Sequence, residues 1–321
     1  MTQTALAVDL GGTKILVGEV TPAGEILTRE KYPSTVVDQR SATEKIKLAI
    51  KNYLQQHIIQ GDLVGIGICV VGRVNTDQGR WLEIHPGLSE PIFLADEIAQ
   101  AFHLPCWITN DVSSAALAES ILGIGQETGN FVYINIGTGI AARVVADNQL
   151  IKGGNSNAGE VGHMVVDMNS DDQCTCGRNG CVELFASGLG MHNQTLKFAP
   201  NYPQTMLTIK EDRRITFQEL ITAYEANDPL ARKVVDQALR AVAALTMNLV
   251  RVSDPEAVVF GGGVMNDDWF LKHLVTFLNA KTVRFVTKGM RVTTLNPNEV
   301  ALKGAATLAF IMERGLKKTY A

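Results

Sequence analysis

The sequence DLGGTK, residues 9–14, interrupts an apolar stretch close to the start of the chain. Apolar runs lie on both sides of it, so the segment predicts two strands joined by a glycine turn. Glycine has no Cβ, and the backbone N–H groups of such a turn can therefore approach an anion closely. Thr13 adds a hydroxyl, Lys14 a positive charge and Asp9 a carboxylate that could hold Mg²⁺ through water. The alternative is an ordinary hairpin turn with a solvated lysine.

A second copy of this turn favours the anion-binding interpretation. The chain repeats it at NIGTG, residues 135–139, between the strand patterns 131–136 and 141–146. The duplication predicts two similar α/β halves facing each other, whose glycine turns hold one triphosphate from both sides. A third glycine run, 261–263, follows a strand pattern and precedes a helical one, although a plain strand-to-helix turn would look the same. The predicted nucleotide-binding residues are Asp9, Gly11, Gly12, Thr13, Lys14, Gly137, Thr138, Gly139, Gly261, Gly262 and Gly263.

The remaining periodicity completes an α/β pattern. The run 64–71 is apolar almost throughout, as in a strand that is buried on both faces. Other predicted strands span 26–31, 106–109 and 257–260, and predicted helices span 41–59, 95–102, 112–122, 229–252 and 302–314. We expect the last helix to pack back onto the N-terminal domain. The expected domains are 1–115 with 302–321, and 116–301, which carries a polar, cysteine-containing segment at 157–183.

The composition argues against several functional classes. The net charge of −4 and the lack of a Lys/Arg-rich run argue against a nucleic-acid partner. No apolar run is long enough to span a bilayer, so no membrane partner is expected. The first residues lack the basic start and apolar core of a secretory signal, which predicts a cytoplasmic protein. Cys69 and Cys106 lie in apolar runs and are expected to be small buried residues.

Asn110 and Asp111 follow the strand pattern 106–109 and precede a helical pattern. In one interpretation Asp111 caps that helix, because Asp is common at such positions. In the other, Asp111 accepts the proton of a substrate hydroxyl. An ordinary Asp, with a pKa of about 3.9, is a weak base. Phosphoryl transfer tolerates this because it needs orientation more than strong deprotonation. The two roles can also coexist.

The segment 157–183 contains a metal-ligand pattern. His163 precedes Cys174 by 11 residues, and Cys174, Cys176 and Cys181 follow with C-x-C-x₄-C spacing. One imidazole and three thiolates fill the tetrahedral shell of Zn²⁺ and leave no position for water, which predicts a structural site. The alternatives are an ordinary core histidine and a redox-active group of cysteines. Three cysteines with a nearby histidine favour zinc.

Glu160 and Glu183 flank this cluster in the sequence. Most glutamates are solvated surface charges, and that is the alternative for both. If zinc holds His163 through one ring nitrogen, the other nitrogen can donate a hydrogen bond. Two fixed carboxylates and one imidazole N–H then form a surface suited to hydroxyl groups, and the predicted ligand is a sugar.

Taken together, these motifs resemble the ROK family of bacterial sugar kinases and sugar-responsive repressors. The matching segments follow the family's order and cover nearly the whole chain. They are DLGGTK (9–14), ND (110–111), IGTG (136–139), NAGEVGH (157–163), CTCGRNGCVE (174–183) and FGGGV (260–264). The resemblance implies an α/β fold of the actin-like (ribonuclease H-like) ATPase class, with two domains and an interdomain cleft where ATP and sugar meet.

The resemblance also implies the reaction and the residues that perform it. A sugar kinase of this kind transfers the γ-phosphate of MgATP to a hexose hydroxyl, here the 6-hydroxyl of glucose, a related hexose or an N-acetylhexosamine. Asp111 would be the catalytic base, and the sugar would be held by Asn110, Glu160, His163 and Glu183. A structural Zn²⁺ would bind His163, Cys174, Cys176 and Cys181. The implied assembly is a homodimer or homotetramer.

Two other functions stay open. Similar repressors carry a DNA-binding module before the first glycine motif, and only eight residues precede Asp9 here. We therefore expect no DNA binding. A catalytically silent sugar sensor is the other alternative, because Arg143, expected in the second phosphate loop, is bulky where similar proteins have small residues.

Overall fold

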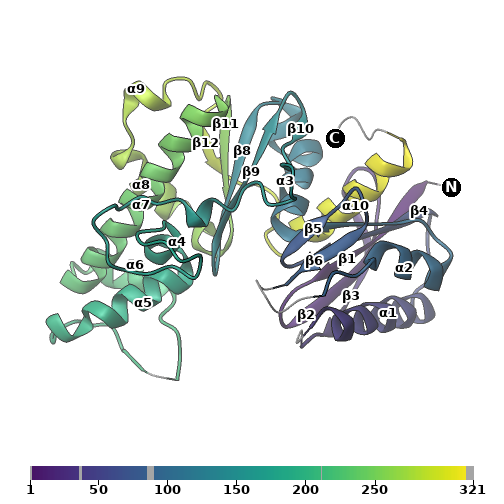
Figure 1. Ribbon diagram of the computed structural model, residues 1–321, viewed down its shortest axis with the longest axis horizontal. Helices are drawn as coiled ribbons and strands as arrows, with labels where there is room; N and C mark the ends of the chain where they lie inside the picture. The colour runs from purple at the N-terminus through teal and green to yellow at the C-terminus, as the bar shows by residue number, and fades with distance from the viewer. Residues whose placement is uncertain (1, 36–37, 85–89, 211, 316–321) are drawn as a thin grey trace. The chain divides into compact units, whose positions relative to one another are not determined.

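The computed structural model describes residues 2–35, 38–84, 90–210 and 212–315. The chain divides into two compact units (Figure 1). The first unit comprises residues 1–129, 145–158 and 294–321, and the second comprises 130–144 and 159–293. The end of the predicted N-terminal domain, 316–321, lies outside the described residues.

The first unit is built on a five-stranded sheet with the order β3-β2-β1-β4-β7. Its strands are β1 (Gln3–Leu10), β2 (Lys14–Val20), β3 (Ile26–Pro33), β4 (Asp62–Val70) and β7 (Cys106–Asn110). β1, β2 and β3 form an antiparallel meander, so the DLGGTK turn joins two strands as predicted. β1, β4 and β7 run parallel, and their carboxyl ends therefore meet at one edge of the sheet.

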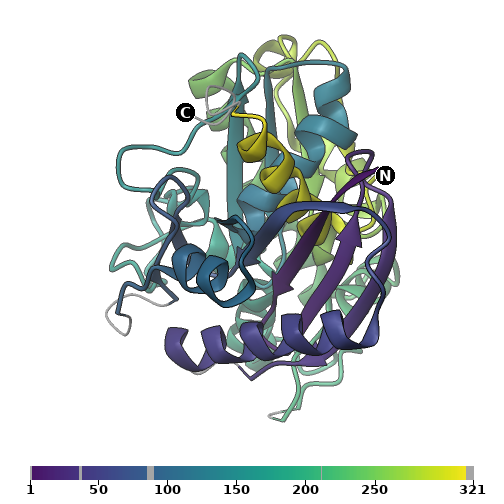
Figure 2. The same ribbon diagram turned by 90° about the vertical axis from the view of Figure 1, so that its right-hand side faces the viewer.

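Helices cover both faces of this sheet. α1 (Gln39–Gln56) and α2 (Leu94–Phe102) pack on one apolar face, and α10 (Val300–Glu313) packs on the other. Figure 2 shows α1 and the yellow α10 on opposite sides of the purple strands. α10 also packs against α3 (Asp111–Leu122). The prediction that the last helix packs onto the N-terminal part of the chain is confirmed. The boundary expected near residue 115 lies inside α3.

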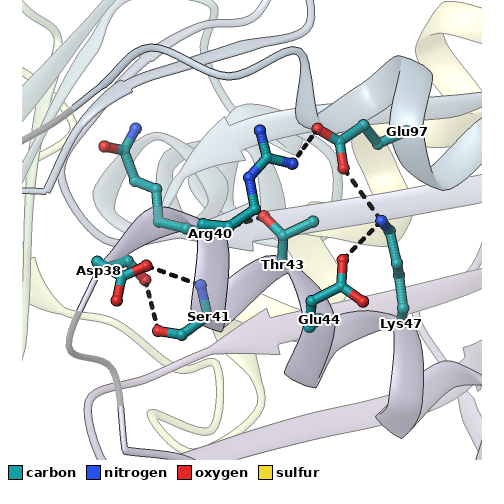
Figure 3. A network of polar contacts seen from close by, with 8 residues as sticks. Asp38, Arg40, Ser41, Thr43, Glu44, Lys47 and Glu97 are labelled. Carbon is teal, nitrogen blue, oxygen red and sulfur yellow. Dashed lines mark hydrogen bonds and ion pairs between the residues drawn. The ribbon is translucent and has the colours of Figure 1, made fainter.

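Polar contacts join α1 to α2 at the surface (Figure 3). Asp38 caps α1 by accepting the N–H of Ser41 at 2.7 Å. Glu97 of α2 then pairs with Arg40 at 2.6 Å and Lys47 at 3.0 Å, both on α1. Exposed ion pairs contribute little to stability. The apolar faces of the two helices therefore contribute most of their attachment.

The second sheet has the order β10-β9-β8-β11-β12. Its strands are β8 (Phe131–Ile136), β9 (Ile140–Ala146), β10 (Gln149–Leu150), β11 (Ala257–Gly261) and β12 (Met290–Val292). The apolar core of the second unit contains inward-facing residues of β8 and β11 together with one face of the long helix α7 (Pro229–Ser253). Asp228 caps α7 and accepts the N–H of Ala231 at 2.9 Å.

The shorter elements were mostly not predicted. They are the hairpin β5 (Arg73–Asn75) and β6 (Arg80–Glu83), the helices α4 (Glu183–Ala186), α5 (Gly188–Phe198), α6 (Phe217–Glu225), α8 (Trp269–Leu274) and α9 (Ala280–Val283), and 3-10 turns at Ile124–Gln126, Val161–His163, Ala199–Asn201, Gly263–Met265 and Val275–Phe277. Among the described helices, none has the length and apolar character that crossing a bilayer requires.

Gly67 of β4 allows the sheet and α10 to approach each other closely. A Cβ at this position would overlap the backbone carbonyl of Ala305 in α10. Backbone cannot change rotamer to make room, so Gly67→Ala is expected to lower the free energy of unfolding by about 1–3 kcal/mol. Gly154→Ala is the matched control, because a Cβ there would meet no atom within 4 Å. Urea unfolding measures both variants, and equal stability would contradict this close packing.

Candidate active site and metal centre

The carboxyl edge of the first sheet gathers the first set of predicted residues. Asp9 of β1 pairs in register with Cys69 of β4, and Cys69 pairs with Thr109 of β7. Asp111 follows β7 directly, as the first residue of α3. The glycine turn and the proposed catalytic base therefore belong to the same edge of one sheet, because all three strands run parallel.

Asp9 is a largely buried carboxylate at this edge. Its Oδ1 accepts a hydrogen bond from the Cys69 thiol, with 3.0 Å between Sγ and Oδ1. Burial raises the pKa of Asp9, while the Cys69 thiol and the positive charge of Lys14 act in the opposite direction. The turn beside it is open: a Cβ at Gly12 would meet no atom within 4 Å. Packing inside the described chain thus does not require a glycine at position 12, whereas the close approach of an anion would.

Asn110, rather than Asp111, caps α3. Asn110 Oδ1 accepts the N–H groups of Val112 at 3.0 Å and Ser113 at 3.1 Å. Its Nδ2 donates to Asp111 Oδ1 at 2.7 Å. The interpretation of Asp111 as the helix cap is therefore wrong, because Asp111 already has helical geometry. The Asn110 amide instead orients the Asp111 carboxylate.

The second glycine turn, residues 137–139, rests on the side chain of Glu183. Glu183 Oε2 accepts the N–H of Ile140 at 2.8 Å. A Cβ at Gly139 would lie 2.6 Å from the same oxygen, so a larger residue there would displace the Glu183 carboxylate. Gly188 at the start of α5 donates its N–H to Gly137 O at 2.8 Å. The carboxylate and the start of α5 together fix the shape of the turn.

The third glycine run packs beside the second turn. Gly262 has a φ of 90°, which favours glycine, and a Cβ there would overlap the backbone of Ile136. Ile136 ends β8 and directly precedes the turn 137–139. The runs 137–139 and 261–263 are therefore neighbours in the second unit.

The predicted metal ligands converge. The ligand atoms of His163, Cys174, Cys176 and Cys181 all lie within 4.8 Å of one another. Cys174 Sγ is 3.3 Å from His163 Nδ1, and Cys176 Sγ is 3.6 Å from Cys181 Sγ. A tetrahedral zinc with Zn–S bonds of about 2.3 Å would place neighbouring sulfurs about 3.8 Å apart. The donor set and its spacing thus fit zinc.

Two thiols of this cluster have pKa values shifted in opposite directions, and the Arg178 backbone N–H lowers that of Cys176. Burial raises the pKa of Cys181 to about 12, and the neighbouring Cys176 and Cys174 act in the same direction. Three thiols and an imidazole lie close together here, so deprotonating the buried thiols is costly even though Arg178 lies beside Cys176. A bound cation would reverse this cost, because it stabilises thiolates directly.

Glu160 and Arg143 form a further polar contact. Arg143 lies within β9 and not in the turn 137–139, and its side chain is only 8% exposed. Its guanidinium donates to Ala142 O at 2.7 Å and lies 3.8 Å from Glu160 Oε1. The placement of Arg143 in the second phosphate loop is therefore wrong, because its side chain contacts the Glu160 segment instead.

Each unit thus gathers its own set of predicted residues. The first brings together the DLGGTK turn, Asn110 and Asp111, and the second brings together the remaining glycine runs with Glu183 and the metal cluster. Sequence reasoning identified Cys69 as buried but missed its bond to Asp9. Only the strand register, which places Cys69 beside Asp9, could have indicated that bond.

Comparison with known proteins identifies the family. The model of the ROK family matches residues 5–310. The chain belongs to the ROK family. A glucokinase of Halalkalibacterium halodurans is 30% identical to this ROK protein, over 98% of this chain and 97% of the relative.

Two solved ROK structures show the same fold. A ROK glucokinase from Streptomyces griseus, in complex with glucose and AMPPNP, has a TM-score of 0.75 at 26% identity and covers 96% of this chain and 99% of its own. A ROK transcriptional regulator, a homologue of the E. coli MLC protein, has a TM-score of 0.85 at 25% identity and covers 99% of this chain and 81% of its own. The predicted actin-like α/β fold is confirmed.

Proposed function

We propose that this ROK protein is an ATP-dependent sugar kinase that phosphorylates a hexose hydroxyl, the 6-hydroxyl of glucose or a related sugar. The observation that carries the proposal is Asp111, oriented by Asn110 at the same strand edge as the DLGGTK turn. The similarity to a glucokinase over nearly the whole chain supports it. So does the structural similarity to a glucokinase that binds glucose and AMPPNP.

The proposed step is an in-line transfer of the γ-phosphoryl group from MgATP to the sugar hydroxyl. The sugar hydroxyl oxygen attacks the γ-phosphorus, its proton passes to the Asp111 carboxylate, and the bond to the ADP oxygen breaks. The transition state is loose, so orienting the hydroxyl matters more than base strength. Backbone N–H groups of the glycine turns, together with Lys14, stabilise the charge on the phosphates. Mg²⁺ held through water by Asp9 would supply further positive charge there.

The sugar would be held by Asn110, Glu160, His163 and Glu183. Nδ1 of His163 is the ring nitrogen beside Cys174, so metal binding through Nδ1 would leave Nε2 to donate to a sugar oxygen. A bound Zn²⁺ would supply rigidity and no chemistry, because four protein donors fill its shell. Glu183 would then link the sugar to the second glycine turn through its bond to Ile140.

A coupled assay of ADP release with a panel of sugars tests this function. The panel contains glucose, mannose, fructose, allose, N-acetylglucosamine and N-acetylmannosamine. We expect MgATP turnover that depends on at least one of them, with mass spectrometry showing a hexose monophosphate as product. If every sugar leaves ADP release at the background rate, the kinase proposal fails.

A sugar-binding regulator without kinase activity is the second candidate. The TM-score of 0.85 to a ROK transcriptional regulator favours it. Three measurements separate the two candidates. A regulator would bind a sugar of the panel in calorimetry, would release no ADP in the coupled assay, and would shift the mobility of operator DNA in a gel. We also propose a cytoplasmic homodimer or homotetramer, whose mass light scattering would give.

A further inference from the structure

Cys69 is a buried thiol of β4 that faces the proposed catalytic edge. Its side chain has no exposed surface, and it packs with Ala5 and Ala7 of β1 against Ala305 and Ala306 of α10. Its Sγ donates to Asp9 Oδ1 at 3.0 Å. The thiol therefore donates a hydrogen bond to the Asp9 carboxylate at a position that water hardly reaches.

The strand register places the same thiol close to the second carboxylate of the edge. Cys69 pairs with Asp9 on one side and with Thr109 on the other, two residues before Asp111. The Asp111 carboxylate is close enough to act electrostatically on the thiol. Cys69 thus lies between the carboxylate assigned to Mg²⁺ and the carboxylate assigned to proton transfer.

Few side chains could fill this position. Neighbouring Gly67 lies against the backbone of Ala305, so α10 is too close to the sheet for a bulky residue at position 69. An apolar residue of similar size would fit but would leave Asp9 without its donor. A buried carboxylate that loses a hydrogen-bond partner no longer favours the orientation in which it accepted that bond. Cysteine and serine combine small size with a donor.

We propose that Cys69 is a positioning residue, whose thiol holds the Asp9 carboxylate in the orientation that MgATP binding requires. Without the donor, the Asp9 carboxylate is free to rotate about its Cα–Cβ and Cβ–Cγ bonds, and binding must then restrict it. This role rests on the proposed kinase function, in which Asp9 holds Mg²⁺ through water. It assigns Cys69 no contact with either substrate.

Two substitutions at one position test the role. Cys69→Ala removes the donor, and Cys69→Ser keeps a donor of similar size. We expect the alanine variant to raise KM for MgATP about five- to tenfold, since a thiol is a weak donor. The Kd of the protein for Mg²⁺–AMPPNP, measured by calorimetry, should rise by the same factor. KM for the sugar should stay within about twofold. The serine variant should stay within about twofold of the wild type in both substrates.

Cys106→Ala is the matched control, because Cys106 is a buried cysteine of β7 that packs in the apolar cluster on the opposite face. It should leave MgATP binding unchanged, and Tm should show that all three variants are folded. Unchanged MgATP binding in Cys69→Ala would overturn the proposal, as would equal weakening in the alanine and serine variants. If the wild type binds Mg²⁺–AMPPNP but phosphorylates no sugar, only the kinase function fails, and calorimetry still decides the role of Cys69. A wild type that binds no nucleotide overturns both.

Discussion

Replacement of Asp111 by Asn is expected to lower kcat for sugar phosphorylation by about 10²–10⁴-fold, the usual contribution of a positioned general base. The substitution is nearly isosteric, and an asparagine Oδ1 can still accept the N–H of Val112, which lies 2.9 Å from Asp111 Oδ1. The cap of α3 also remains, because Asn110 provides it. The variant should therefore fold normally and keep KM for MgATP within a few-fold. The coupled ADP assay at saturating substrate measures kcat.

Asp96→Asn is the control for this change. Asp96 lies exposed in the first turn of α2, so the substitution removes the same charge from the start of another helix in the same unit. Its kcat should equal that of the wild type. An Asp111→Asn enzyme that keeps the wild-type rate would show that another group accepts the proton.

Replacement of Cys181 by Ala is expected to remove bound zinc and weaken sugar binding. Cys181 is fully buried, and the remaining donors, His163, Cys174 and Cys176, cannot fill a tetrahedral shell. His163 and the adjoining loop would lose their fixed positions, so KM for the sugar should rise about 10–100-fold. Elemental analysis should find one zinc per wild-type chain and almost none in the variant.

Cys106→Ala again supplies the comparison, since it removes a buried cysteine outside the metal cluster. It should keep its zinc and its sugar KM. Acid should also remove zinc from the wild type and raise its KM for the sugar, as Cys181→Ala does, because protonated thiols and imidazole release the metal. Wild-type protein that binds no zinc at neutral pH would refute the metal centre. An unchanged sugar KM in a zinc-free variant would refute its role in sugar binding.

The metal cluster could be predicted because its geometry is local. Three of its ligands lie within eight residues, and the glycines between them have positive φ, 86° at Gly177 and 72° at Gly180. A chain that turns this tightly has few ways to place three thiols. The parallel edge that gathers Asp9 and Asp111 could likewise be expected from strands that end in polar residues.

Features that depend on tertiary contacts could not be predicted. The cap of α3 is decided by which of two adjacent side chains points back toward the helix, and Asn110 and Asp111 are both capable of it. The direction of Arg143 depends on where the Glu160 segment lies beside β9. The hairpin of β5 and β6 has strands of three and four residues, too short to show a period.

The position of α10 in the chain has a consequence for synthesis. The ribosome makes β1, β4 and β7 first, and it must then make all of residues 130–293 before α10 follows. Until then, the face of the sheet with Ala5, Ala7 and Cys69 lacks its covering helix. The residues of the second unit end at 293, so its core can form before α10 is made, whereas the uncovered apolar face of the first sheet is open to contacts with other chains until then.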